Sequence, residues 1–289
     1  MRSTPLSEHI FKRAQGAWLG QLAGDSLGSL VEFQTAATIA NAYPQGIREL
    51  VDGGTWNTLA GQPTDDSEMA LALVNSLLEE SNYAAAGAMT HYQRWYQSQP
   101  FDIGFTTVRA LTGDPNHDSQ ANGALMRASP LGIVAVGTPL TQRCAWAAAD
   151  AALTHPHANC VAINQLYVAA IATAIESGST GADLYEQITR WARQWDLPAE
   201  VTEVTEKAAR IPVQDYQSHM GWVMIAWHNA LWQLLSAPSL EEGIIDTVMQ
   251  GGDTDTNAAI CGALLGAVYG LEAVPTRNAA QYGRNYPLD

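Results

Sequence analysis

Two short acidic segments, far apart in the chain, contain the side chains best suited to bind a cation. Residues 63–68 read PTDDSE, and residues 251–256 read GGDTDT. Carboxylates crowded at a turn repel one another unless a cation lies among them. Hard oxygen ligands of this kind suit Mg²⁺, Mn²⁺ or Ca²⁺ better than zinc. We therefore expect the fold to bring the two segments together around metal, as in an enzyme.

A structural interpretation without metal fits the same residues. Asp65 would be the N-cap of one helix and Asp253 the N-cap of another, where acidic residues are favoured by the helix dipole. Capping does not require the second aspartate in each segment, however, and the adjacent threonines add hydroxyl oxygens. Such a set, with water, suits two octahedral cations. The pattern alone is compatible with either interpretation. The candidate ligands are Thr64, Asp65, Asp66, Asp253, Asp255 and Thr256.

An isolated glutamate, Glu32, lies in the segment 24–33, which reads GDSLGSLVEF. Most glutamates beside apolar residues face solvent. If Glu32 is instead buried near the metal, it would be a ligand or a general acid–base with a shifted pKa. The sequence leaves both interpretations open.

A loop at residues 114–127, DPNHDSQANGALMR, precedes another helix and suits an anion or a sugar. Backbone N–H groups at the helix N-terminus would bind it together with Ser119, Asn122 and Arg127. The same residues fit an exposed turn, and Arg127 also fits a structural partner of a carboxylate, the role that we place first. Residues 154–157, THPH, lack a third soft ligand for zinc. One of these two histidines is either a substrate-binding group or a plain loop residue.

The composition indicates a heavily buried, soluble protein. Hydrophobic residues make up 47% of the 289 residues and charged residues only 15%, so the chain can bury a large core. The formal net charge of -15 repels bulk nucleic acid and anionic membranes. The apolar runs are expected to fall short of a membrane span, and the N-terminus has no apolar signal sequence. We expect a cytoplasmic protein whose three cysteines are free thiols.

The chain is expected to form one all-α domain over residues 1–289. The first helix, from about Glu8 to Ser26, carries glycines at 16, 20, 24 and 28, and the last helix carries small residues at 258, 262, 266 and 270. Glycine destabilises a helix by about 1 kcal/mol relative to alanine, so these ridges need a packing reason. We expect the two helices to pack tightly, with each other as the first candidate partners. Other helices are expected at residues 66–80, 83–97, 138–153, 159–177, 182–195, 198–210, 221–236 and 239–250, with a strand candidate at Ile47–Val51.

Taken in order, these segments resemble the ADP-ribosylglycohydrolase family, the group that contains dinitrogenase reductase-activating glycohydrolase. The resemblance extends from about Phe11 to Gly270, and the order of its blocks is more specific than any single block. The chain departs from the family pattern at Ala121, where glycine is expected, and at His157, which closely follows His155. The matching blocks are residues 20–33, 64–67, 122–132, 154–155, 221–232 and 251–267.

The resemblance implies an orthogonal all-helical domain with a binuclear Mg²⁺ or Mn²⁺ centre. The implied metal ligands are Thr64, Asp65, Asp66, Asp253, Asp255 and Thr256, with Glu32 binding the centre or next to it. The implied catalytic residues are Glu32, Asp65 and Asp66. The cleft that holds the distal ribose and phosphates would contain Ser119, Asn122, Gly123, Arg127 and His155.

The reaction implied by the resemblance is hydrolysis of the glycosidic bond between C1 of a terminal ribose and an acceptor side chain, with arginine as the first candidate. The alternative substrates are O-linked: ADP-ribosylated serine, O-acetyl-ADP-ribose or nucleic-acid adducts. A third interpretation is an immunity or inhibitor protein that binds an ADP-ribosyltransferase. A degenerate acidic cluster would favour that role, but here every expected oxygen ligand is present. We therefore expect a hydrolase whose partners are ADP-ribosylated protein and ADP-ribose, with a cognate transferase as a further candidate.

Overall fold

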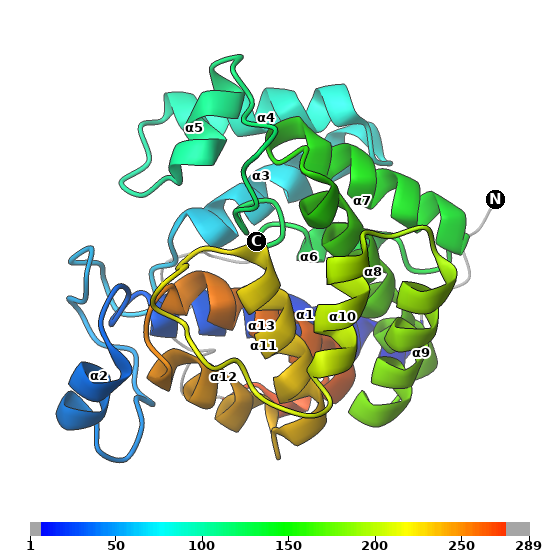
Figure 1. Ribbon diagram of the computed structural model, residues 1–289. Helices are drawn as coiled ribbons and strands as arrows, with labels where there is room; N and C mark the ends of the chain where they lie inside the picture. The colour runs from blue at the N-terminus through cyan, green and yellow to red at the C-terminus, as the bar shows by residue number, and fades with distance from the viewer. Residues whose placement is uncertain (1–6, 276–289) are drawn as a thin grey trace.

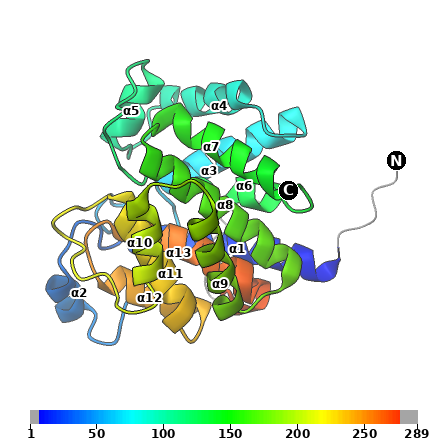
Figure 2. The ribbon, with the colours of Figure 1, turned by 45° about the vertical axis from the view of Figure 1, so that its right-hand side comes forward.

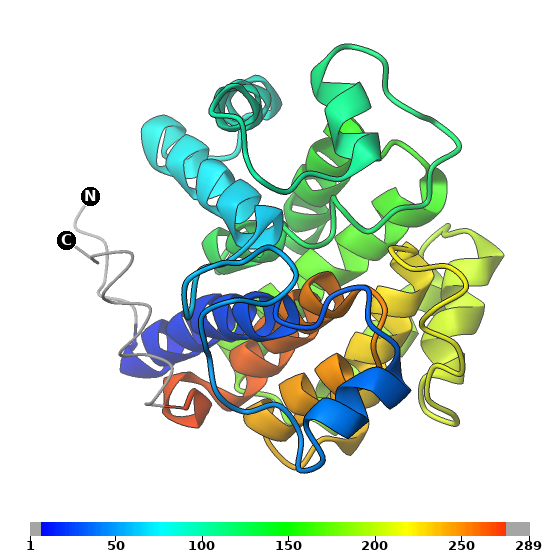
Figure 3. The same cartoon turned by 90° about the vertical axis from the view of Figure 1, so that its left-hand side faces the viewer.

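Two long helices, α1 (Glu8–Gly28) and α13 (Thr254–Tyr269), pack against each other in the middle of the protein (Figures 1 and 3). A Cβ atom placed on Gly24 would lie 2.0 Å from the carbonyl oxygen of Ala258. The same close approach recurs at the other glycines along both helices. The two backbones therefore touch at positions where at least one of the two helices has glycine, which confirms that the glycine ridges pack on each other.

The computed structural model describes residues 7–275, and this part of the chain contains helices and isolated β-bridges but no β-strand. Helices α3, α4, α5 and α7 lie on one side of the α1–α13 pair, and α9 to α12 lie on the other (Figures 1 and 2). The all-α prediction is confirmed. The remaining elements are α2 (Ala36–Ala42), α3 (Asp65–Glu80), α4 (Ala85–Gln97), α5 (Phe105–Leu111), α6 (Ser129–Val134), α7 (Leu140–Thr154), α8 (Ala158–Ser177), α9 (Gly181–Gln194), α10 (Ala199–Lys207), α11 (Val223–Ser236), α12 (Leu240–Met249) and a 3-10 turn at Leu271–Ala273.

Helix α8 is a long, apolar helix in the core of the fold. By length and composition it is the one described helix able to cross a membrane, although the sequence predicted no run of that kind. Within the fold, 78% of its most apolar window is buried. Residues such as Ile163, Leu166 and Ile171 are fully buried in the core. The apolar character of α8 is therefore explained by its place in the core.

The segment Ile47–Val51 is not a strand, contrary to the sequence prediction. It has an irregular conformation, and no described residue pairs with it as a strand. Its most apolar side chains, Ile47 and Leu50, are buried against the core. They therefore anchor the long loop between α2 and α3. The short helices α2 and α5 were not predicted, because so few residues do not establish a helical period. The helix expected directly after the loop at residues 114–127 is α6.

Helix α3 begins with a different cap from the one predicted. Thr64, not Asp65, is the N-cap residue, and its side chain makes no capping hydrogen bond. The cap comes from α1: the Asp25 carboxylate accepts hydrogen bonds from the backbone N–H groups of Thr64, at 2.9 Å, and Ser67, at 3.0 Å. Asp253, the N-cap residue of α13, also makes no side-chain capping bond. The aspartates of both segments are therefore not needed as caps.

Candidate metal centre and active-site cleft

The N-termini of α3 and α13 meet beside a cavity of about 420 Å³. Thr64 Oγ1 lies 3.4 Å from Asp255 Oδ2, and Thr256 Oγ1 lies 3.2 Å from Asp66 Oδ2. The fold thus brings the two acidic segments together, as the sequence predicted, and direct hydrogen bonds join them. The residues predicted to bind metal are all buried: Glu32, Thr64, Asp65, Asp66, Asp253, Asp255 and Thr256.

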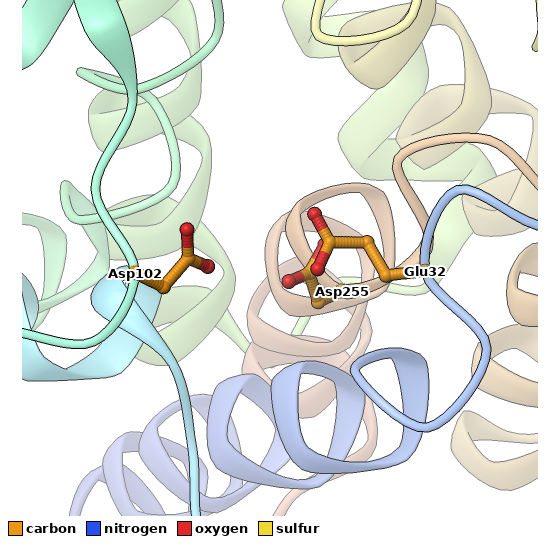
Figure 4. Close-up of side chains that lie close together, drawn as sticks. All are labelled: Glu32, Asp102 and Asp255. Atoms are coloured by element: carbon orange, nitrogen blue, oxygen red, sulfur yellow. The ribbon is translucent and has the colours of Figure 1, made fainter. Parts of the chain in front are cut away.

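Three carboxylates lie close together at this cavity, those of Glu32, Asp102 and Asp255 (Figure 4). One oxygen atom from each lies within 4.8 Å of the others. Glu32 comes from the loop after α1, Asp102 from the loop before α5, and Asp255 from the first turn of α13. Oxygen atoms grouped in this way suit a hard divalent cation.

Sequence reasoning missed two carboxylates of this region, Asp102 and Asp25. Asp102 stands between apolar residues just before α5, which is the same kind of signal that drew attention to Glu32. Asp25 was given no role near the end of the first helix, but from within α1 it caps α3. Burial raises the pKa of Asp25 to about 6 despite its hydrogen bonds to Thr64 and Ser67.

The Glu32 carboxylate is held in place by a neighbouring loop. Trp56 Nε1 donates a 2.6 Å hydrogen bond to Glu32 Oε2, and Thr55 Oγ1 donates to the backbone carbonyl of Glu32 at 3.0 Å. Phe33 has a left-handed backbone with φ 65°, which is rare for a bulky residue, and its N–H donates to the carbonyl of Gly252 at 2.7 Å. This strained turn fixes the Glu32 loop against the segment before α13.

Burial raises the pKa of the clustered carboxylates. The pKa of Glu32 is raised to about 8, first by loss of solvent and then by the charges of Asp253 and Asp102. Burial and mutual repulsion place the pKa values of Asp66 and Asp255 well above their usual range. Among the described residues no lysine or arginine lines the cavity, and Asp66 Oδ1 is buried without a hydrogen-bond partner. The donor set therefore fits a cation, which would supply the missing positive charge.

The metal-free protein is expected to lose stability as the pH rises from about 5 to 8. A carboxyl whose pKa is higher in the folded than in the unfolded state binds more protons when folded. For Glu32 this stabilisation is complete below its ordinary pKa of 4.5 and is lost as the pH rises through about 8. A bound cation favours the ionised form. At a fixed Mn²⁺ concentration, the increase in Tm should therefore grow with pH, and it should reach about 5–10 °C where that concentration is about 100 times Kd.

Thermal unfolding in EDTA and in Mn²⁺, followed across this pH range, measures the effect. Glu32→Gln is the matched control. Glutamine does not titrate, so in this variant the increase in Tm on adding Mn²⁺ should depend less on pH. A Tm increase that is the same at every pH would contradict the assignment of a raised carboxyl pKa to this cluster.

Three of the predicted substrate-binding residues line the cavity: Asn122, Gly123 and His155. Asn122 Nδ2 donates a 2.7 Å hydrogen bond to Asp253 Oδ2. A Cβ atom on Gly123 would lie 3.0 Å from His155 Cε1, so glycine lets the loop approach the imidazole closely. Burial, together with the charge of Arg127, lowers the pKa of His155 to about 3. The ring is therefore neutral near pH 7 and offers hydrogen bonds rather than charge.

Arg127 does not reach the cavity, which corrects its assignment as a substrate-binding residue. Its side chain is fully buried, with Nε 3.3 Å from Asp150 Oδ2. Its Nη1 group donates to the carbonyl of Gly123 at 3.1 Å and to Thr154 Oγ1 at 2.8 Å. Arg127 thus supports the cleft from behind, through the residues next to Asn122 and His155. These contacts agree with the structural role that the sequence analysis placed first for Arg127.

Ser119 and His157 lie next to the cleft rather than in it. Ser119 Oγ is 2.8 Å from Thr106 Oγ1, and of the two only Thr106 lines the cavity. His157 is the N-cap residue of α8, where Nδ1 accepts a hydrogen bond from the backbone of Asn159 at 3.1 Å. Ser119 therefore contacts the cavity wall and is corrected from a lining residue to a supporting one.

Known proteins are similar to this chain in both sequence and fold. The family model described as ADP-ribosylglycohydrolase matches residues 6–286. The ADP-ribosyl-[dinitrogen reductase] glycohydrolase of Rhodospirillum rubrum is 30% identical over 282 residues, which cover 92% of this chain and 89% of that protein. The ADP-ribosylarginine hydrolase Tri1 of Pseudomonas putida (strain GB-1) is 27% identical over 290 residues, with coverages of 93% and 73%. A solved structure described as an ADP-ribosylglycohydrolase-related protein complex has a TM-score of 0.82 at 30% identity, with coverages of 95% and 93%.

The family match and the hydrolase relatives place the chain among the hydrolases of glycosidic bonds. The chain belongs to the ADP-ribosylglycohydrolase family. The family match covers both acidic segments and the loop that contains Asn122, which confirms the resemblance found in the sequence.

Proposed function

We propose that this chain is a metal-dependent hydrolase that removes ADP-ribose from modified arginine side chains of proteins. The carboxylate cluster of Glu32, Asp102 and Asp255 carries the proposal, because it combines oxygen ligands with groups able to move a proton. Hydrolysis breaks the bond between C1 of the ribose and a guanidinium nitrogen. Water supplies the hydroxyl group that C1 gains and the proton that the nitrogen gains.

Two Mg²⁺ or Mn²⁺ ions are the proposed cofactors. When bound, they supply positive charge beside the ribose and promote the ionisation of water. The unpartnered Asp66 Oδ1 and the absence of a lysine or arginine from the described lining support this assignment. The residues that would hold the ions are Thr64, Asp65, Asp66, Asp253, Asp255 and Thr256, with Glu32 and Asp102 beside them.

The protein's own carboxylates divide the remaining work. Asp65 or Asp66 would orient the attacking water, and Glu32 would move a proton at the ribose or at the leaving group. Glu32 suits this role because its carboxylate lies in the cluster and is held in position by the hydrogen bond from Trp56 Nε1.

The neutral wall of the cavity would bind the rest of the substrate. Asn122, Gly123 and His155 offer an amide, a close backbone and an uncharged imidazole, which suit the distal ribose and the phosphates. Arginine is favoured as the acceptor because a guanidinium group is attracted by the carboxylates that line the cavity. The relative named ADP-ribosylarginine hydrolase supports the same choice.

The test is release of free ADP-ribose from arginine-ADP-ribosylated and serine-ADP-ribosylated proteins in parallel, with Mg²⁺, Mn²⁺ or EDTA. We expect metal-dependent release from the arginine-linked protein. Release from the serine-linked protein alone would replace arginine by an O-linked acceptor. No release from either protein, with metal bound, would overturn the proposal and favour O-acetyl-ADP-ribose, nucleic-acid adducts or a binding role.

A further inference from the structure

A group of aromatic side chains lines or adjoins the acidic cavity, and three of them expose much of their surface. The Trp56 ring meets Phe33 edge-on, with 6.5 Å between ring centroids, and lies 6.1 Å from the ring of Phe101. Phe33 is 53% exposed, Phe101 41% and Phe105 75%. Phe33, Trp56 and Phe105 also line the cavity. We call these four residues the aromatic rim.

Packing within the chain does not account for the aromatic rim. Phe105 is the first residue of α5, and Phe33 has a left-handed backbone, so neither position favours an aromatic residue for local reasons. Single exposed apolar residues are common on protein surfaces, but apolar groups gathered at one cavity mark a binding surface. Aromatic residues are also the ones that contribute most at protein interfaces.

The rim lies beside the carboxylates of the proposed reaction. Phe33 follows Glu32 in the sequence, and Phe101 precedes Asp102. Both carboxylates belong to the cluster that carries the proposed chemistry. The proposed ADP-ribose-binding residues, such as Asn122, belong to a different loop. A group attached to C1 of a ribose bound in this cavity would therefore leave the cavity past the aromatic rim.

We propose that the aromatic rim binds the polypeptide on either side of the modified side chain, with apolar residues of that segment against the rings. The proposal rests on the proposed function, because it takes the acceptor to be a protein side chain. The negative charge of the cavity selects among substrate polypeptides. Its carboxylates would repel acidic residues that lie beside the modified arginine. The carboxylates that line the cavity are Glu32, Asp65, Asp102, Asp253 and Asp255.

The experiment compares kcat/KM of the wild type and of Phe105→Ala on two substrates with the same scissile bond. One substrate is ADP-ribosylated free arginine, and the other is a peptide in which leucines flank the ADP-ribosylated arginine. We expect Phe105→Ala to lower the ratio of peptide to free-arginine kcat/KM about tenfold. Leu78→Ala is the matched control, because Leu78 is 73% exposed on α3 and does not line the cavity. A peptide with flanking aspartates should be a poorer wild-type substrate than the leucine peptide.

The outcomes separate this proposal from the proposed function. If Phe105→Ala leaves the ratio unchanged, or lowers both activities equally, the docking surface is overturned and the proposed function stands. If the aspartate peptide is cleaved as fast as the leucine peptide, the proposed selection by charge is overturned. If the wild type binds Mn²⁺ but cleaves none of the three substrates, the proposed function fails and the docking surface fails with it.

Discussion

Replacement of Glu32 by glutamine is expected to lower kcat about a hundredfold to ten-thousandfold while metal stays bound. Glutamine keeps an oxygen atom at the site but cannot gain or lose a proton at it. The remaining proposed ligands, on α3 and α13, are unchanged, so the cations should be retained. Turnover of ADP-ribosylated arginine at saturating concentration, together with elemental analysis of the purified variant, measures both quantities.

Trp56→Phe tests how much the positioning of the Glu32 carboxylate contributes to kcat, apart from the carboxylate itself. The variant removes the indole N–H that donates the 2.6 Å hydrogen bond to Glu32 Oε2 but keeps the carboxylate and an aromatic ring. We expect a loss of kcat of about tenfold, the size of one hydrogen bond to a charged group.

The prediction for Glu32→Gln has a clear contradicting outcome. If Glu32→Gln turns over substrate as fast as the wild type, Glu32 is not the proton-transfer group. Asp102 then becomes the next candidate, since it belongs to the same cluster.

The helices and their closest contact could be predicted from the sequence because their signals are local and regular. The glycines of α1 recur every four residues and so lie on one face, and α13 repeats the spacing. The meeting of the two acidic segments could also be inferred. Carboxylates crowded within each segment repel one another unless a cation lies among them, and one cation site can serve both segments. In the structure the threonine of each segment is hydrogen-bonded to an aspartate of the other.

The parts of the site that could not be predicted depend on contacts between distant residues. Asp25 acts on α3, through the backbone of Thr64, and nothing in its own neighbourhood indicates that role. Asp102 gains its role only when the loop before α5 reaches Glu32. Arg127 fits a substrate contact as well as a structural one until Asp150, on α7, supplies its buried partner. Such long-range pairing is fixed by the folded backbone and not by spacing.

Gly24→Ala is expected to destabilise the protein by at least about 3 kcal/mol. In an ordinary helix the same change stabilises by about 1 kcal/mol, so the expected sign is reversed. The added methyl group would lie 2.0 Å from the carbonyl oxygen and 2.3 Å from the carbonyl carbon of Ala258. Both are backbone atoms of α13, and relief requires the two helices to separate. Urea unfolding followed by circular dichroism measures the change in the free energy of unfolding.

Gly87→Ala in α4 is the matched control, because its nearest neighbours are the side-chain atoms Ser76 Oγ, at 3.0 Å, and Glu80 Oε1, at 3.2 Å. These side chains can move, so the free energy of unfolding of Gly87→Ala should stay within about 1 kcal/mol of the wild-type value.

Separation of α1 from α13 in Gly24→Ala would also displace Asp25 from Asp255, so the affinity for Mn²⁺ should fall together with stability. If Gly24→Ala keeps wild-type stability and Mn²⁺ affinity, the close helix contact does not position the acidic cluster.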